Sequence, residues 1–116
     1  MKITRLEELE KTRMTMEGAK DVWKQIPIAK ADGTPSFSLR VFTIMPGGHT
    51  PYHAHPFEHL NYVMEGEGAL VMESGDESPV RKGDFALVLP GEKHRYRNSS
   101  QDRPMVMICA VPKEYE

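Results

Sequence analysis

The chain has 116 residues and a formal net charge of −2; 28% of its residues are charged and 39% are hydrophobic. These values are typical of one globular domain and not of a disordered chain. Acidic and basic residues alternate without a basic stripe, which argues against nucleic-acid binding, and the single cysteine, Cys109, excludes an internal disulfide. The charged N-terminus lacks the apolar segment of a signal peptide, and no apolar run reaches the roughly 18 residues of a membrane helix, so we expect a cytoplasmic protein without membrane contacts.

Two parts are predicted along the chain: an N-terminal arm at residues 1–20 and one barrel domain at residues 21–116. In the arm, Leu6 and Leu9 are three residues apart among charges, which is compatible with a short helical turn. A loosely ordered arm or an edge strand fits those residues equally well.

The remainder of the sequence predicts short strands separated by Gly and Pro. Pro27 restricts the first of them to an edge or a strand end, and Pro46-Gly47-Gly48 is predicted to end the second. The predicted strands are 22–28, 37–45, 60–64, 69–72, 85–89 and 105–111. Helical periodicity is almost absent, so the pattern predicts an all-β sandwich or barrel.

Histidines are the residues most indicative of function. His53, His55 and His59 fall within seven residues and share parity, so a strand would place their imidazoles on one face, where a divalent metal could bind. A fourth, His94, follows an apolar strand that could return beside the first. An isolated histidine is usually a surface or hydrogen-bonded core residue, but this combination favours a metal site made of all four.

Two blocks of the sequence resemble the paired motifs of the cupin superfamily. In residues 47–66, Gly47, His53, His55 and Gly66 match the first motif. In residues 83–98, Gly83, Asp84, Pro90, His94 and Asn98 match the second. The resemblance covers residues 37–111 and implies a small single-domain double-stranded β-helix, or jelly roll, with a metal inside the barrel mouth.

The sequence departs from the cupin pattern at two positions. His59 stands where cupins usually supply a glutamate ligand, while the neighbouring Glu58 has the opposite parity; Pro90 lies one residue later than usual. The histidine resembles the four-histidine manganese cupins of thermophilic bacteria, which implies Mn(II) or Fe(II). Imidazole ligands alone leave Zn, Ni and Cu open.

Four neutral ligands would leave the full charge on the metal and make it a stronger Lewis acid. On an octahedral ion they would leave two open positions, which are usually adjacent in cupins. Binding requires neutral imidazoles, so affinity is expected to fall below a pH of roughly 6.5.

Other residues have two interpretations each. Arg40 lies either in the pocket, orienting an anionic substrate, or on the barrel surface; the four-histidine resemblance favours the pocket. Tyr96 is the second candidate catalytic residue, because period two from His94 points it to the same side. Cys109 is a buried thiol that the resemblance turns toward the metal. His49 is predicted to be a loop residue, with a supporting role behind the metal ligands as the alternative. Asn98 is predicted to be structural, and Trp23, Phe57 and the methionines to pack in the core or an interface.

Three functions follow from this site. The first is a dioxygenase-like metal-dependent oxidoreductase acting on a small organic molecule, with Arg40 or Tyr96 orienting the substrate. The second is an isomerase, lyase or cyclase with a Lewis-acid metal, which the absence of a carboxylate at pocket parity makes less favoured. The third is a non-catalytic ligand-binding barrel. The small barrel also predicts a homodimer, with the arm helping to cover the partner's sheet.

Overall fold

The computed structural model describes all residues, 1–116, and contains nine strands and three 3₁₀ turns. None of the helical turns is long and apolar enough to span a membrane. The strands are β1 (Thr12–Arg13), β2 (Lys20–Ile28), β3 (Phe37–His49), β4 (His59–Glu65), β5 (Glu67–Met72), β6 (Glu77–Arg81), β7 (Phe85–Val88), β8 (His94–Arg97) and β9 (Met105–Pro112). The turns are η1 (Leu6–Glu8), η2 (Lys30–Asp32) and η3 (Lys113–Tyr115).

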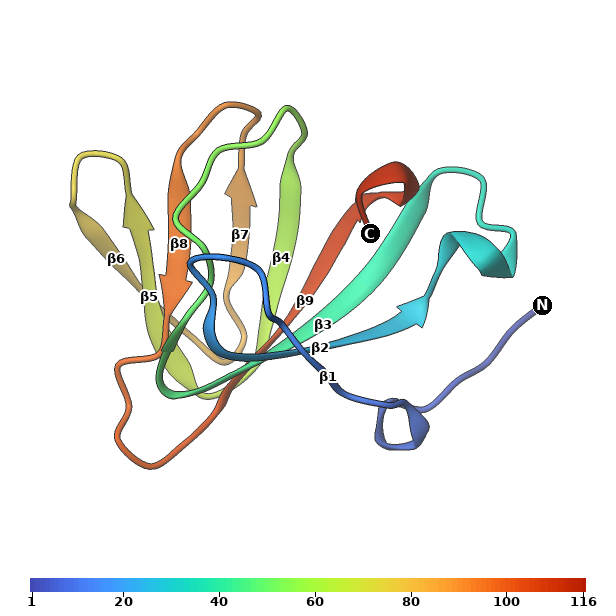
Figure 1. Ribbon diagram of the computed structural model, residues 1–116, viewed down its shortest axis with the longest axis horizontal. Coiled ribbons are helices and arrows are strands. Elements are labelled where there is room, and N and C mark those ends of the chain that lie inside the picture. Colours follow the sequence, from blue (N-terminus) through green and yellow to red (C-terminus); the bar gives the residue numbers. More distant parts are fainter.

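All strand pairs are antiparallel, and the main path of the sheet has the order β6-β5-β8-β3-β9-β4-β7, with β2 and then β1 branching from β3. β8 and β4 are three places apart in this order, yet the Asn61 side chain of β4 bonds the Tyr96 hydroxyl of β8. The sheet must therefore roll up so that its inner face encloses one interior (Figure 1). This jelly roll confirms the predicted all-β class.

The core lies on the inner face because side chains alternate along each strand. In β9, Met105, Met107, Cys109 and Val111 are buried, while the residues between them are only partly so. They pack with apolar residues of β2, β3, β4 and β6. This period of two places Cys109 on the inner face, as the resemblance to the cupins implied.

Three strand predictions were wrong or incomplete. β3 does not stop at Pro46 but runs to His49, because it bends at Gly47 and exchanges its partner: Gly47 N–H donates to Asn98 O, and His49 pairs with Arg97 of β8. β6 and β8 were not predicted as strands. Both are short and rich in charged residues, so their sequences carry little apolar alternation.

The N-terminal segment lies against the chain's own sheet. η1 confirms the helical turn near Leu6, and the Gln25 side chain donates to the carbonyls of Leu6 and Leu9. β1 pairs with β2, and Met14 N–H donates to Val22 O. The arm therefore covers an edge of its own barrel; that it also covers a partner's sheet stays a prediction.

Candidate metal centre

The sequence predicted that His53 and His55 lie on a regular strand. In the structure they lie in the loop between β3 and β4. Pro51 and Pro56 interrupt the backbone ladder there, since proline has no N–H to donate. The loop is fixed to β8 instead: His53 and His94 exchange two backbone hydrogen bonds, of 3.1 and 3.0 Å, and Gly91 N–H donates to His55 O. A loop and a strand thus position the histidines.

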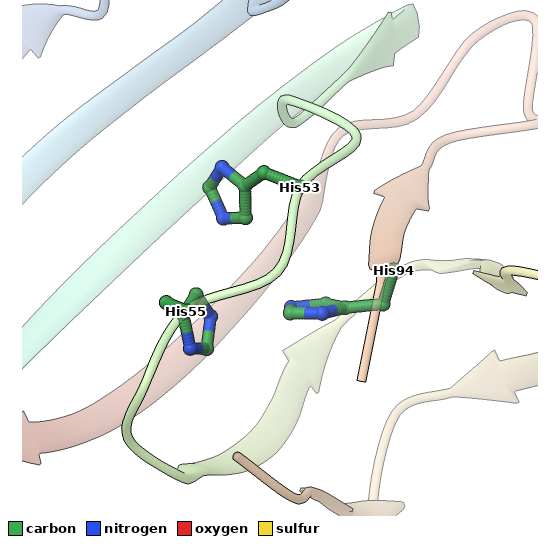
Figure 2. Close-up of side chains that lie close together, drawn as sticks. All are labelled: His53, His55 and His94. Atoms are coloured by element: carbon green, nitrogen blue, oxygen red, sulfur yellow. The ribbon is translucent and has the colours of Figure 1, made fainter. Parts of the chain in front are cut away.

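His53, His55 and His94 converge. Their candidate ligand nitrogens all lie within 4.8 Å of one another. Figure 2 shows the His94 ring, carried by β8, directed toward the loop that holds His53 and His55. The structure thus contains a possible three-histidine metal site.

Backbone carbonyls fix the protonation of two of these rings. Nδ1–H of His55 donates to the Phe57 carbonyl and Nδ1–H of His94 to the Glu92 carbonyl, each at 2.8 Å. A carbonyl only accepts, so Nδ1 carries the proton and the Nε2 lone pair is free for a metal. Nε2 of His55 is buried and has no hydrogen-bond partner, which is the state expected of a nitrogen that binds a metal.

The surroundings also favour the neutral form of His53 and of His55. Burial, reinforced by His55, His94 and Arg40, lowers the pKa of His53; burial likewise lowers the pKa of His55, more than the Phe57 carbonyl raises it. Neutral imidazole is the form that binds metal. The donor set and its protonation therefore fit a divalent ion.

His59, the predicted fourth ligand, lies beside this triad but outside it. Its ring centroid is 4.0 Å from that of His55 and 5.6 Å from that of His94. Its Nε2 contacts Arg40 Nη2 at 3.3 Å, and a guanidinium can only donate. Burial, with His55 and Arg40, lowers the pKa of His59 to about 2, so the ring is neutral. Ligation by His59 stays a proposal.

A cavity of about 340 Å³ opens onto the histidines, within the size range of small-molecule sites. It is lined by the four histidines, by Arg40, Asn61, Tyr96 and Cys109, and by an apolar set that includes Met14, Met16, Phe42, Phe57, Met107 and Tyr115. No aspartate or glutamate lines it. Arg40, whose direction the sequence left open, and Cys109 both face this cavity.

The remaining predicted residues are placed as follows. Burial raises the pKa of Tyr96 to about 12, and burial also raises the pKa of the Cys109 thiol, so neither is an activated nucleophile. His49 ends β3, with Nδ1 against Thr50 O, and does not line the cavity. Asn98 is buried and bonds three backbone groups, which agrees with its predicted structural role.

Some cavity residues were missed by the sequence reasoning. Met14 and Met16 come from the arm, whose position no pattern predicts, and Tyr115 comes from η3. Asn61 could have been found, because it follows His59 by two positions on the same strand and is polar on an inward face.

The family model for the cupin domain matches residues 40–111, more than half of the chain. The chain is a cupin. Among solved structures, the polyketide cyclase RemF from Streptomyces resistomycificus is 28% identical to this cupin, with a TM-score of 0.91 and coverage of 97% of this chain and 80% of that chain.

Two curated relatives have different activities in their names. The L-ectoine synthase of Vibrio campbellii is 30% identical over 91 residues, covering 77% of this cupin and 69% of the synthase. The gentisate 1,2-dioxygenase 1 of Aquipseudomonas alcaligenes is 30% identical over 101 residues, covering 81% of this cupin but only 29% of the dioxygenase. The relatives thus establish the family and leave the reaction open.

Proposed function

We propose that this cupin is a metal-dependent enzyme that closes rings in a small poly-β-keto substrate without consuming dioxygen. The observation that carries the proposal is the cavity itself. The imidazoles of His53, His55 and His94 face apolar walls, the buried Nε2 of His55 has no hydrogen-bond partner, and no carboxylate lines the cavity to neutralise a bound cation. Such a centre suits the polarisation of a carbonyl oxygen.

The similarity to RemF supports this reaction class over others. RemF is a polyketide cyclase by name, and its similarity extends over nearly the whole of this chain. The similarity to the gentisate dioxygenase extends over only 29% of that protein, so it supports the dioxygenase reaction less strongly. An oxygenase nevertheless remains the second candidate, because a centre with open positions and that 30% identity both favour it.

The metal site is proposed to contain His59 as a fourth ligand, beside His53, His55 and His94. This requires the Nε2 of His59 to release its contact with Arg40; the His59 ring already lies 4.0 Å from the His55 ring. Mn(II) and Fe(II) are the first metals to examine, given the resemblance to four-histidine cupins, followed by Zn, Ni and Cu. When bound, the metal would act as a Lewis acid that stabilises negative charge on a substrate oxygen.

The chain's own residues then bind and orient the substrate. Arg40 supplies a cation beside the histidines, where an enolate-like oxygen would be stabilised. Met14, Met16, Phe57 and Tyr115 provide apolar walls that bind the carbon skeleton and exclude water. Tyr96 places a neutral hydroxyl in the same cavity as a hydrogen-bond donor.

A model substrate tests the proposal. Heptane-2,4,6-trione closes by an intramolecular aldol reaction and loses one water to give 5-methylresorcinol, with no change in oxidation state. We expect the metal-loaded protein to accelerate this conversion equally under argon and in air, measured by chromatography. The His94→Ala variant should lose the acceleration, and Tyr52→Phe, which lies outside the cavity, should retain it.

The outcomes separate the candidates. Turnover of the trione or of a phenolic acid only in air, with matching dioxygen uptake, would replace ring closure with the oxygenase. Absence of acceleration in every metal form would reject the proposal in favour of a binding barrel.

We also propose that the protein forms a homodimer. The outer face of β4 and β7 exposes Leu60, Phe85 and Leu87, and the Tyr62 ring lies tilted beside that of Phe85. No charged residue lines the shallow depression between them. Exposed apolar patches of this kind commonly mark protein contacts.

A further inference from the structure

Three polar side chains lie side by side on the inner face of the barrel, at the same level on neighbouring strands. Cys109 of β9 is directly opposite Arg40 of β3 on one side and Asn61 of β4 on the other. The next inward level is apolar, with Met107 opposite Phe42 and Val63. This polar row therefore forms the boundary between the cavity and the core.

The row has hydrogen-bonding capacity that the protein does not use. Asn61 is 4% exposed; its Nδ2 donates to the Tyr96 hydroxyl at 2.6 Å, while its Oδ1 has no partner. With the amide turned over, the hydroxyl would donate to Oδ1 and Nδ2 would be left unpaired. In either orientation a buried polar group of the Asn61–Tyr96 pair lacks a partner, at a position that lines the cavity.

Arg40 adds an uncompensated positive charge to the row. Its guanidinium donates to the Tyr115 carbonyl, the His59 ring and the Cys109 sulfur, and it lies over the Phe42 ring, 4.9 Å from the ring centroid. Its Nε is buried without a partner. The ion pairs of the protein all involve other residues, and no carboxylate lines the cavity. A partly buried cation without an acidic partner favours an electron-rich oxygen of a ligand.

We propose that Arg40, Asn61 and Tyr96 form a binding subsite for a second substrate oxygen, distinct from the oxygen held at the histidines. An enol or phenol hydroxyl suits it, because such a group accepts a hydrogen bond from Arg40 and donates one to Asn61 Oδ1. The substrate class is therefore 1,3-dioxygenated: a β-diketone or a meta-dihydroxy aromatic compound. The assignment rests on the proposed function in so far as the first oxygen needs a metal at the histidines.

The test uses two fluorescent probes that differ by one oxygen, 1,3-dihydroxynaphthalene and 1-naphthol. Neither can chelate one metal through two oxygens, because the hydroxyl groups of the first are meta to each other. Both are titrated under argon against the metal-free and the Zn-loaded protein. The ratio of the two dissociation constants reports the second oxygen alone and is insensitive to a partly misfolded fraction.

We expect the wild type to bind 1,3-dihydroxynaphthalene about tenfold more tightly than 1-naphthol, the effect of one well-formed hydrogen bond near a charge. Tyr96→Phe and Asn61→Leu should each bring the ratio near one. The control Tyr52→Phe removes a hydroxyl that bonds the Met72 carbonyl away from the cavity, and should leave the ratio unchanged.

The two proposals fail in different ways. If Zn leaves both affinities unchanged but the ratio still depends on Asn61 and Tyr96, the metal function is wrong and the subsite stands. If Zn strengthens binding of both probes but the ratio is near one in the wild type, or unaffected by both substitutions, the subsite is refuted.

Discussion

Replacing Asn98 by alanine should destabilise the fold. Asn98 is 2% exposed, and its Nδ2 donates to Ile44 O at 2.9 Å and to Arg103 O at 2.7 Å, while its Oδ1 accepts from Ser100 N at 2.9 Å. It therefore ties the bend of β3 to β8 and to the loop that precedes β9. Its backbone bonds to Gly47 and Gly48 do not depend on the side chain.

The loss is estimated from these three bonds. At about 1 kcal/mol net for each, Asn98→Ala should lower the free energy of unfolding by about 3 kcal/mol. With an unfolding entropy of about 2.1 cal/mol/K for each of the 116 residues, that corresponds to a fall of about 12 °C in Tm. Urea titration gives the free energy, and calorimetry gives Tm.

The neighbouring Ser99 provides the control, because it is exposed and its side chain makes no hydrogen bond. Ser99→Ala should change stability by less than about 0.5 kcal/mol. If Asn98→Ala stayed within about 1 kcal/mol of the wild type, the structural role assigned to this residue would be refuted.

Three further predictions concern strain, protonation and assembly. Gly66 has φ +76°, and a Cβ there would lie 2.3 Å from Pro104 O; Gly33 has φ +87°, but a Cβ there would meet open space. Gly33→Ala should lower the free energy of unfolding by about 1 kcal/mol, and Gly66→Ala should lower it further. Equal losses of Tm would contradict this. Folding lowers the pKa values of His53, His55 and His59, so below pH 6.5 the unfolded chain binds more protons than the folded one. The metal-free protein should therefore lose stability as the pH falls below 6.5, by at most about 1.4 kcal/mol per pH unit for each histidine. A urea midpoint that is higher at pH 5 than at pH 6.5 would contradict this. In light scattering, the double variant Phe85→Lys, Leu87→Lys of β7 should be monomeric, while Glu73→Gln, on an exposed turn outside this face, should stay dimeric. A wild-type monomer would refute the dimer.

The lowered histidine pKa values also modify one expectation from the sequence. Reference values place the loss of metal binding below pH 6.5, but ligands that stay neutral to lower pH should retain metal below that point. Burial is a property of the folded cavity, which the spacing of histidines in a sequence does not encode.

Much of the fold could be predicted because its strands carry the alternation of apolar residues. β9 is the clearest case, and its inward row contains Cys109 as expected. β8 could not be predicted as a strand, because its His-Arg-Tyr-Arg sequence is polar and its pairing with β5 is long-range. The Pro46-Gly47-Gly48 sequence was predicted to end a strand. It bends β3 instead, and the sequence alone does not show that β8 is available there as a new partner strand.

The convergence of three of the four predicted histidines was foreseen more fully than the way the chain positions them. His53, His55 and His94 converge, although a bridged loop and not a strand aligns the first two. The contacts of Arg40 with His59 and Cys109 form only because β3, β4 and β9 lie side by side in the fold. The position of Asn61 opposite Cys109 depends on the same arrangement. The sequence favoured an oxygenase, while the apolar cavity and the similarity to RemF favour ring closure.

Metal content tests the central claim most directly. The untagged protein would be stripped of weakly bound metal, reconstituted separately with Mn, Fe, Zn, Ni and Cu, and measured by elemental analysis beside His94→Ala, His59→Ala and the control His49→Ala. We predict about one metal per chain in the wild type and in His49→Ala, loss in His94→Ala, and weakened retention in His59→Ala. A wild type that takes up no metal, or a His94→Ala variant that retains it fully, would contradict the histidine site.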